Sequence, residues 1–328
     1  MLMNSKQRVL TALAHKQPDR TPLWLGHPQP EVLANLQDYY GAADRESLLR
    51  VVGDDFRYAD SYHWHAPNER WVFDFERTGL VKLETMHEVE TFSWPDPKHA
   101  DVGATRQSCL AAKDSAVYGG SWSPFFHDCW NLLGGEDYLI KMLDEPALVE
   151  AVTERLVDFH YAVNDKVFKE AGGLIDFFFF GNDLGTQNGI LFSRELFLKF
   201  IKPGMMRLIE QAHSYGIHVW LHTCGSVRKL IPDLIDMGIE ALHPVQVSAA
   251  GMNVEELGRE FRGKLLFVGG VDVHYLLRKG TPREVREAVR HNKKHLGPGY
   301  VVSPSHEAIL PDVPVENLAA MIEEAKND

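Results

Sequence analysis

The chain has 328 residues, of which 45% are hydrophobic and 24% charged, and this composition is typical of a globular protein with one large α/β domain or two smaller ones. Its formal charge of −12 argues against nucleic acid as the main partner, because phosphate binding needs a basic surface. Three cysteines without a disulfide spacing, a polar N-terminus and the lack of a membrane-length apolar run predict a cytoplasmic protein without membrane segments.

Short apolar strands and amphipathic helices alternate in the first sixty residues. The expected elements are a helix capped by Ser5, a strand at 21–26, helices at 31–40 and 45–52, and a second strand at 55–60. The region from 63 to 116 shows less regular periodicity, with strand-like pieces at 71–75 and 80–85. Because no linker composition flanks it, we interpret this region as an irregular insertion after strand two.

From residue 116 onward the alternation of strands and helices is regular. Strands are expected at 116–122, at 173–181, within 216–226, and at 239–245, 265–271 and 300–303. Helices are expected across 136–171 with a break at Pro146, at 193–215, 230–237 and 254–261, from 281 onward, and at 315–326.

About eight strands, each followed by a helix, predict a parallel sheet with right-handed crossovers. Within this length, eight such units favour a closed (β/α)₈ TIM barrel that forms a single domain over residues 1–328. A GxGxxG or GxxxxGK[ST] turn would have favoured an open doubly wound sheet, and neither occurs in the sequence.

The fifth predicted strand ends in a possible half of a metal site. His222 and Cys224 lie two residues apart, so their side chains share one face of the strand, and Val219 and Leu221 share the other. His306, after the eighth strand, could contribute a third ligand across the barrel mouth, and three protein ligands with one open position are typical of catalytic zinc. Alternatively, His306 is merely hydrogen-bonded and Cys224 is a small buried hydrophobe.

Two carboxylates at predicted strand ends are candidates for catalysis. Asp183 and Asp55 are expected in a partly buried barrel mouth, where a raised pKa would suit acid/base chemistry. The structural alternatives are that Asp183 caps the following loop and that Asp55 pairs with Arg57. Other polar residues at the same rim are expected to bind substrate, namely His27, Asn182, Gln187 and Gln246.

Several segments of the chain together resemble the uroporphyrinogen decarboxylase superfamily. The matching segments are Arg8 to Leu13, Pro18 to Pro22, Gly53 to Arg57, Asp183 to Gln187, His222 to Gly225 and Asp312 to Asn317. The resemblance covers nearly the whole chain. It implies a (β/α)₈ barrel with its site at the strand C-termini, in agreement with the pattern of elements.

The resemblance implies one of two chemistries. The decarboxylases act on a tetrapyrrole without a cofactor and carry an Arg-Gln-Ala-Gly-Arg segment after strand one, where this chain has Leu25 to Pro30 without an arginine. An anionic substrate would lack its charge partners there. The methyltransferase branch binds zinc through His-x-Cys and a late cysteine, activates a thiol and exchanges methyl groups with a corrinoid protein. This chain is similar to that branch at His222 and Cys224, but His306 occupies the late position.

The leading interpretation is a zinc-dependent methyltransferase that moves a methyl group between a corrinoid protein and a small acceptor or donor. His222, Cys224 and His306 would bind the metal, Asp183 and Gln187 would position substrate, and Asp55 would serve as an acid/base or supporting group. The alternatives are a cofactor-free uroporphyrinogen-type decarboxylase, in which Asp55 binds pyrrole N–H groups, and a catalytically silent barrel that binds a corrinoid or tetrapyrrole.

Overall fold

A seven-stranded parallel sheet in the form of half a barrel lies at the centre of the molecule. The computed structural model describes residues 3–65 and 82–327. The strand order is β10-β9-β8-β7-β6-β5-β2. The bounds of these strands, in chain order, are β2 Phe56–Tyr58, β5 Ala116–Gly119, β6 Phe177–Gly181, β7 His218–His222, β8 Ala241–Val245, β9 Leu266–Val271 and β10 Tyr300–Pro304.

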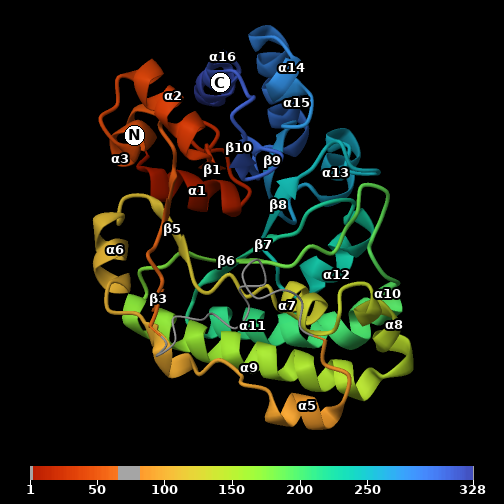
Figure 1. Cartoon of the computed structure of the whole chain (residues 1–328). Helices are drawn as coiled ribbons and strands as arrows, with labels where there is room; N and C mark the ends of the chain where they lie inside the picture. The colour runs from red at the N-terminus through yellow and green to blue at the C-terminus, as the bar shows by residue number, and fades with distance from the viewer. Residues whose placement is uncertain (1–2, 66–81, 328) are drawn as a thin grey trace.

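Helices connect successive strands and cover the outer face of the sheet (Figure 1). The N-terminal helices lie beside the C-terminal one, where the Lys326 ammonium donates to the Val51 carbonyl at 3.2 Å. The principal helices are α1 Ser5–Leu13, α2 Pro30–Tyr40, α3 Arg45–Val52, α7 Phe125–Leu132, α8 Asp137–Asp144, α9 Pro146–Ala171, α11 Lys202–Ser214, α12 Ile231–Asp236, α13 Val254–Phe261, α15 Pro282–Leu296 and α16 Val315–Lys326.

The strand expected at 21–26 is reduced to a short extended segment between β10 and the start of β2. Val302 forms an isolated parallel bridge with Leu23, and its N–H donates to the Pro22 carbonyl at 2.8 Å. On the other side, the Asp55 N–H donates to the Leu23 carbonyl at 2.9 Å. Farther along, β1 (His27–Pro28) pairs in parallel with β11 (Ala308–Ile309).

Alternating side chains of each strand enter two separate layers of the core. Trp220 and Phe179 belong to an inner cluster that also includes Val9 and Ala12 of α1. Val219 and Leu221 belong to the outer cluster between sheet and helices. The prediction that Val219 and Leu221 face away from His222 is therefore confirmed, because His222 has the same strand parity as the inward-facing Trp220.

The helix expected at 193–215 is divided in the structure. It consists of α10 (Arg194–Leu196), a π-helical turn η2 (Phe197–Ile201) and α11, which has Pro203 in its first turn. Proline cannot donate the hydrogen bond that a continuous α-helix requires at that position. The break expected at Pro146 is confirmed, since α8 ends at Asp144 and α9 begins at Pro146.

Short elements occupy the described part of the region between β2 and β5. They are β3 (His63–Trp64), α5 (Met86–Thr91), the turn η1 (Pro97–His99), β4 (Ala100–Asp101) and α6 (Thr105–Ala111), and β3 pairs antiparallel with β4. The strand-like piece predicted at 71–75 lies outside the described residues. After β7 and β9, the short helices η3 (Arg228–Leu230) and α14 (Leu276–Lys279) complete the connections. No helix within the described ranges has the length and apolarity needed to cross a membrane.

Candidate metal and substrate site

The C-terminal ends of β6, β7 and β8 lie level with one another. In the parallel register Gly181 is opposite His222, and His222 is opposite His243. The residues that follow these positions therefore leave the sheet at the same edge. This places Asp183, two residues after Gly181, beside the His222 and Cys224 side chains at the mouth of the sheet.

Two turns at this edge approach each other through their backbones. Gly225 has φ of +84°, and a Cβ at this position would lie 2.5 Å from the Gly185 carbonyl carbon. A Cβ at Gly185 would lie 2.7 Å from the Cys224 carbonyl oxygen. Because only glycine permits these approaches, the two residues bring the loop after β6 against the loop after β7. The Thr223 hydroxyl accepts from the Leu184 N–H at 3.0 Å and adds to this contact.

Asp183, His222 and Cys224 form the first group of metal-ligand atoms. His222 Nε2 lies 3.4 Å from Cys224 Sγ and 3.4 Å from Asp183 Oδ1. The Cys224 backbone N–H also donates to Asp183 Oδ1 at 2.8 Å. With metal–sulfur bonds of about 2.3 Å and metal–nitrogen or –oxygen bonds of about 2.0–2.1 Å, tetrahedral zinc ligands stand roughly 3.3–3.6 Å apart. The three side chains are of types that bind zinc, both separations from His222 Nε2 match this spacing, and all three ligand atoms lie within 4.8 Å of one another.

The other ring nitrogen of His222 faces a second group. His222 Nδ1 lies 2.9 Å from His243 Nδ1 and 3.4 Å from Glu307 Oε2. A separation of 2.9 Å is that of a hydrogen bond rather than of two ligands on one metal. The metal-binding form of His222 would keep the shared proton on Nδ1 and leave the Nε2 lone pair free on the side of Cys224 and Asp183, whereas without a metal a proton on Nε2 is donated to Asp183. Such a contact to the non-ligating nitrogen orients a metal-binding imidazole.

Burial and charge give the members of this site different protonation states. Burial raises the pKa of Asp183, but the hydrogen bond and charge of His222 outweigh it and lower the pKa to about 2. Burial and the charges of Asp183 and Glu307 raise the pKa of the Cys224 thiol. Burial also lowers the pKa of His243 well below its ordinary value, so that ring is neutral. A carboxylate is thus ionised beside a thiol that a bound cation would deprotonate.

His306, the predicted third ligand, lies next to these groups but in neither of them. Its ring centroid is 6.1 Å from that of His222, at an interplanar angle of 90°. Its Nδ1 accepts from the Ala308 N–H at 3.0 Å. Among the described residues the groups able to share a metal at this mouth contain Asp183 or Glu307 instead. No role for Glu307 or His243 was predicted from the sequence, although His243 lies within a predicted strand and Glu307 follows one.

The residues expected to bind substrate divide among three environments. Gln187, Gln246 and His306 line a cavity of about 330 Å³ beside the site. His27 lines a separate aromatic cavity. Asn182 is buried, and its amide accepts from the Phe126 N–H at 2.9 Å and donates to the Ser123 carbonyl at 3.2 Å. These backbone contacts give Asn182 a positioning role for the loop after β5.

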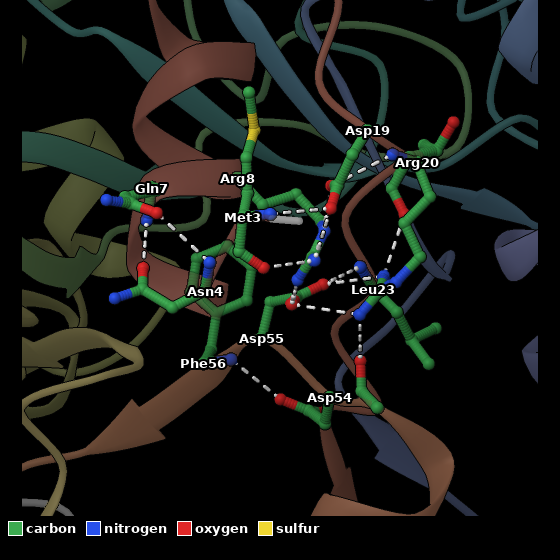
Figure 2. Close-up of polar contacts among 12 residues, drawn as sticks. Met3, Asn4, Gln7, Arg8, Asp19, Arg20, Leu23, Asp54, Asp55 and Phe56 are labelled. Atoms are coloured by element: carbon green, nitrogen blue, oxygen red, sulfur yellow. Dashed lines mark hydrogen bonds and ion pairs between the residues drawn. The ribbon is translucent and has the colours of Figure 1, made fainter. Parts of the chain in front are cut away.

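Asp55 does not join this cluster, because it precedes β2 and lies at the N-terminal end of the sheet. Its buried carboxylate accepts from Arg8 at 2.7 Å, from Arg20 at 2.9 and 3.0 Å and from the Leu23 N–H at 2.9 Å (Figure 2). The partner considered from the sequence was Arg57, which instead contacts Glu46 at 2.8 Å. The arginines around Asp55 come from α1 and the loop after it.

Comparison with known proteins agrees with this architecture. The family described as uroporphyrinogen decarboxylase (URO-D) matches residues 82–327, and the chain belongs to this family. Among solved structures, a methyltransferase from Methanosarcina mazei superposes with a TM-score of 0.69 and 18% sequence identity over 98% of each chain. At this identity the likeness establishes the fold.

A second solved structure, D-psicose 3-epimerase in the presence of D-fructose, has a TM-score of 0.35 and 13% identity. It covers 83% of this chain and 95% of the epimerase, and the similarity is too low to support an argument. No curated protein sequence matches the chain.

Proposed function

We propose that the protein is a zinc-dependent methyltransferase that moves a methyl group between a corrinoid carried by a partner protein and a small acceptor or donor. The single observation that carries the proposal is the group formed by Asp183, His222 and Cys224, whose atoms are spaced like the ligands of one zinc ion. The fold shared with the Methanosarcina mazei methyltransferase supports the same activity.

Each side chain at this site would have its own role. When bound, zinc supplies Lewis acidity and a low-pKa position for a soft ligand such as a thiol. Cys224 Sγ and His222 Nε2 bind the metal, while His243 orients the His222 ring from the opposite side. Asp183 contributes a permanently ionised oxygen. Glu307 Oε2 lies 3.4 Å from His222 Nδ1, and Gln187 and Gln246 line the cavity beside the site, where they would bind substrate.

The expectation that His306 is the third metal ligand stays a proposal. Its ring centroid lies 6.1 Å from that of His222, so the side chain is next to the proposed ligands. In this arrangement His306 and Asp183 compete for one coordination position. A His306→Ala variant that retains full metal content would assign the position to Asp183.

We also infer that the strands close into a single (β/α)₈ barrel domain over residues 1–328. The backbone bonds of residues 22–24 to β10 on one side and to Asp55 on the other support closure, because they link the two edges of the sheet. Three free cysteines, one of them a proposed metal ligand, suit a reducing cytoplasm.

Metal analysis of purified protein tests the proposal directly. We expect about one zinc per chain, lost in Cys224→Ala and in His222→Ala. Surface residues Glu255, His291 and His295 form another group that could bind a metal, so the double variant His291→Ala/His295→Ala is the matched control and should retain the zinc. Unchanged metal content in Cys224→Ala would overturn the site.

Activity is tested with methylcobalamin as the methyl donor and a small thiol as the acceptor, measured by the change in corrinoid absorbance. We expect turnover in the wild type and at least a hundredfold loss in Cys224→Ala. Decarboxylation of uroporphyrinogen by the metal-free protein would contradict the proposal and favour the carboxy-lyase reaction. Binding of a corrinoid without any turnover would favour a silent barrel.

A further inference from the structure

A cavity of about 280 Å³ beside the metal-ligand group has walls made mainly of aromatic rings. It is lined by His27, Tyr58, Tyr118, Trp122 and Phe179, with Glu307 as its acidic residue. The rings form a continuous wall, with centroid separations of 5.1 Å for Trp122 and Phe179, 5.6 Å for Tyr118 and Phe179, and 5.5 Å for Tyr58 and Tyr118. We refer to it as the aromatic cavity.

The aromatic cavity adjoins the proposed metal site directly. The Trp122 ring centroid lies 5.2 Å from that of His222. Glu307, which also lines the cavity, has its Oε2 atom 3.4 Å from His222 Nδ1. A ligand in the cavity would therefore lie within reach of a group bound at the metal.

Contacts of the backbone around Trp122 hold this residue in place although it is 40% exposed. The Gly181 N–H donates to the Trp122 carbonyl at 3.0 Å, and a Cβ at Gly181 would lie only 2.1 Å from the indole ring. On either side, the Ser121 N–H donates to the Asn164 side chain at 2.7 Å, and Ser123 has φ of +48°. A large exposed ring with such support is typical of a preorganised binding surface.

The charge in the aromatic cavity is negative. Among the described residues that line it, Glu307 is the only carboxylate, and the described ion pairs of Glu307 involve His222 and His306 but no lysine or arginine. Burial lowers the pKa of His27, so this ring adds no positive charge at neutral pH. The neighbouring hollow beyond Tyr58 and Tyr118 is lined by two arginines and two acidic residues, namely Arg45, Arg57, Glu46 and Asp54.

Aromatic faces together with one carboxylate that has no lysine or arginine partner among the described residues recognise a cation that needs no hydrogen bonds. The negative face of each ring attracts a cation placed over it, and methylated ammonium groups are recognised in this way. An anion would be repelled by Glu307, and a ligand rich in hydrogen-bonding groups would lose its hydration against the rings. A neutral aryl group could stack on the rings but would gain nothing from the carboxylate.

We propose that the aromatic cavity binds a methylated ammonium group of a small substrate. The binding itself follows from the cavity, whereas the assignment of its ligand to the methyl-transfer reaction rests on the proposed function. Trp122 and Tyr58 supply the exposed ring faces, and Glu307 supplies the counter-charge. Trp122 is in this view a specificity-determining residue.

Calorimetry with the purified full chain tests the binding with two probes of equal shape. Choline carries a trimethylammonium group, and 3,3-dimethylbutan-1-ol replaces its charged nitrogen by carbon. We expect choline to bind at least tenfold more tightly. Equal affinity of the two probes, or no binding of choline, would overturn the proposal, and tighter binding of the neutral probe would assign the cavity to uncharged groups.

Variants separate the contributions of the rings and the carboxylate. Trp122→Ala should weaken choline binding at least tenfold and Trp122→Phe less, while Glu307→Gln should weaken choline but not the neutral probe. Tyr39, which is 50% exposed on α2, gives the matched control Tyr39→Ala, which should bind as the wild type does. Undiminished binding by Trp122→Ala with a native circular dichroism spectrum would contradict the assignment.

The same measurements distinguish this inference from the proposed function. Choline binding that persists in metal-free Cys224→Ala, together with a lack of methyl transfer by the wild type, would contradict only the proposed function. Methyl transfer to a thiol without choline binding would contradict only the inference.

Discussion

Two consecutive aspartates at the start of β2 are buried for different reasons. Asp55 is surrounded by the guanidinium groups of Arg8 and Arg20. Asp54 accepts backbone N–H groups of Leu25 and Phe56 at 2.6 and 2.8 Å, but burial prevails and raises its pKa to about 7. These two adjacent aspartates thus have different hydrogen-bond partners, because alternate residues of an extended segment face opposite sides of the sheet.

Asp54 is expected to make stability depend on pH. Because its folded pKa of about 7 lies above the unfolded value of about 3.9, its stabilising contribution is present below about pH 4 and is lost as pH rises through about 7. Urea unfolding of the wild type and Asp54→Asn at pH 5 and pH 8 measures this. The variant should gain about 3 kcal/mol relative to the wild type between these pH values. An unchanged difference at both pH values would contradict the assignment.

At the scale of elements, the site depends on two turns whose backbones touch. Gly225, with φ of +84°, leaves β7 and contacts Gly185 of the turn after β6. Gly216, before β7, has a similar φ of +72°, but no atom lies within 4 Å of the position that a Cβ would take there. Alanine substitutions at these two glycines therefore distinguish the free-energy cost of backbone strain alone from the effect of losing the contact between the turns.

Gly225→Ala should lower zinc affinity at least tenfold, because the displaced turns move Cys224 from Asp183. Gly216→Ala should cost about 1–2 kcal/mol of stability from the left-handed conformation alone and leave zinc affinity unchanged. Chelator competition measures the zinc affinity of both variants, and urea unfolding measures their stability. Equal zinc affinity in Gly225→Ala and the wild type would mean that the turn contact does not determine the site.

At the scale of the whole molecule, the N-terminal and C-terminal ends of the sheet have different roles. Helix α1 covers the N-terminal end, where Val9 and Ala12 enter the inner core and Arg8 reaches Asp55 (Figure 2). The ligand groups and both cavities beside them lie at the C-terminal end. This division is common among barrel proteins, in which one end contributes stability and the other function.

Asp55→Asn should therefore destabilise the protein without changing its metal site. Loss of one partner from a buried ion-pair network costs about 3–5 kcal/mol, because half-buried Arg20 would lose its carboxylate and buried Arg8 would keep only Asp19. Thermal unfolding measures the loss, and zinc content and methyl transfer per folded protein should match the wild type. If Asp55 is the acid/base group predicted from the sequence, activity would instead fall while folding was retained.

Local patterns in the sequence predicted much of the fold. The strands at β5 to β10 and the break at Pro146 lie where apolar runs and proline indicated, since strand pitch and the missing proline N–H are properties of a few adjacent residues. The pairing of His222 and Cys224 on one face was predictable for the same reason. The structure of the segment at 21–26 was less predictable, because its contacts with β10 and Asp55 join parts of the chain that are far apart in sequence.

By itself, the sequence determined the order of elements, the family resemblance and the inward direction of His222. Only the tertiary structure decided which carboxylate meets this imidazole. Asp183 approaches because two glycine turns touch, and Glu307 because the chain returns to the C-terminal edge of the sheet after β10. Asp55 is absent because it precedes its strand rather than following it. The aromatic cavity likewise combines rings from separate strands and loops, and such proximity arises from parallel register rather than from any local pattern.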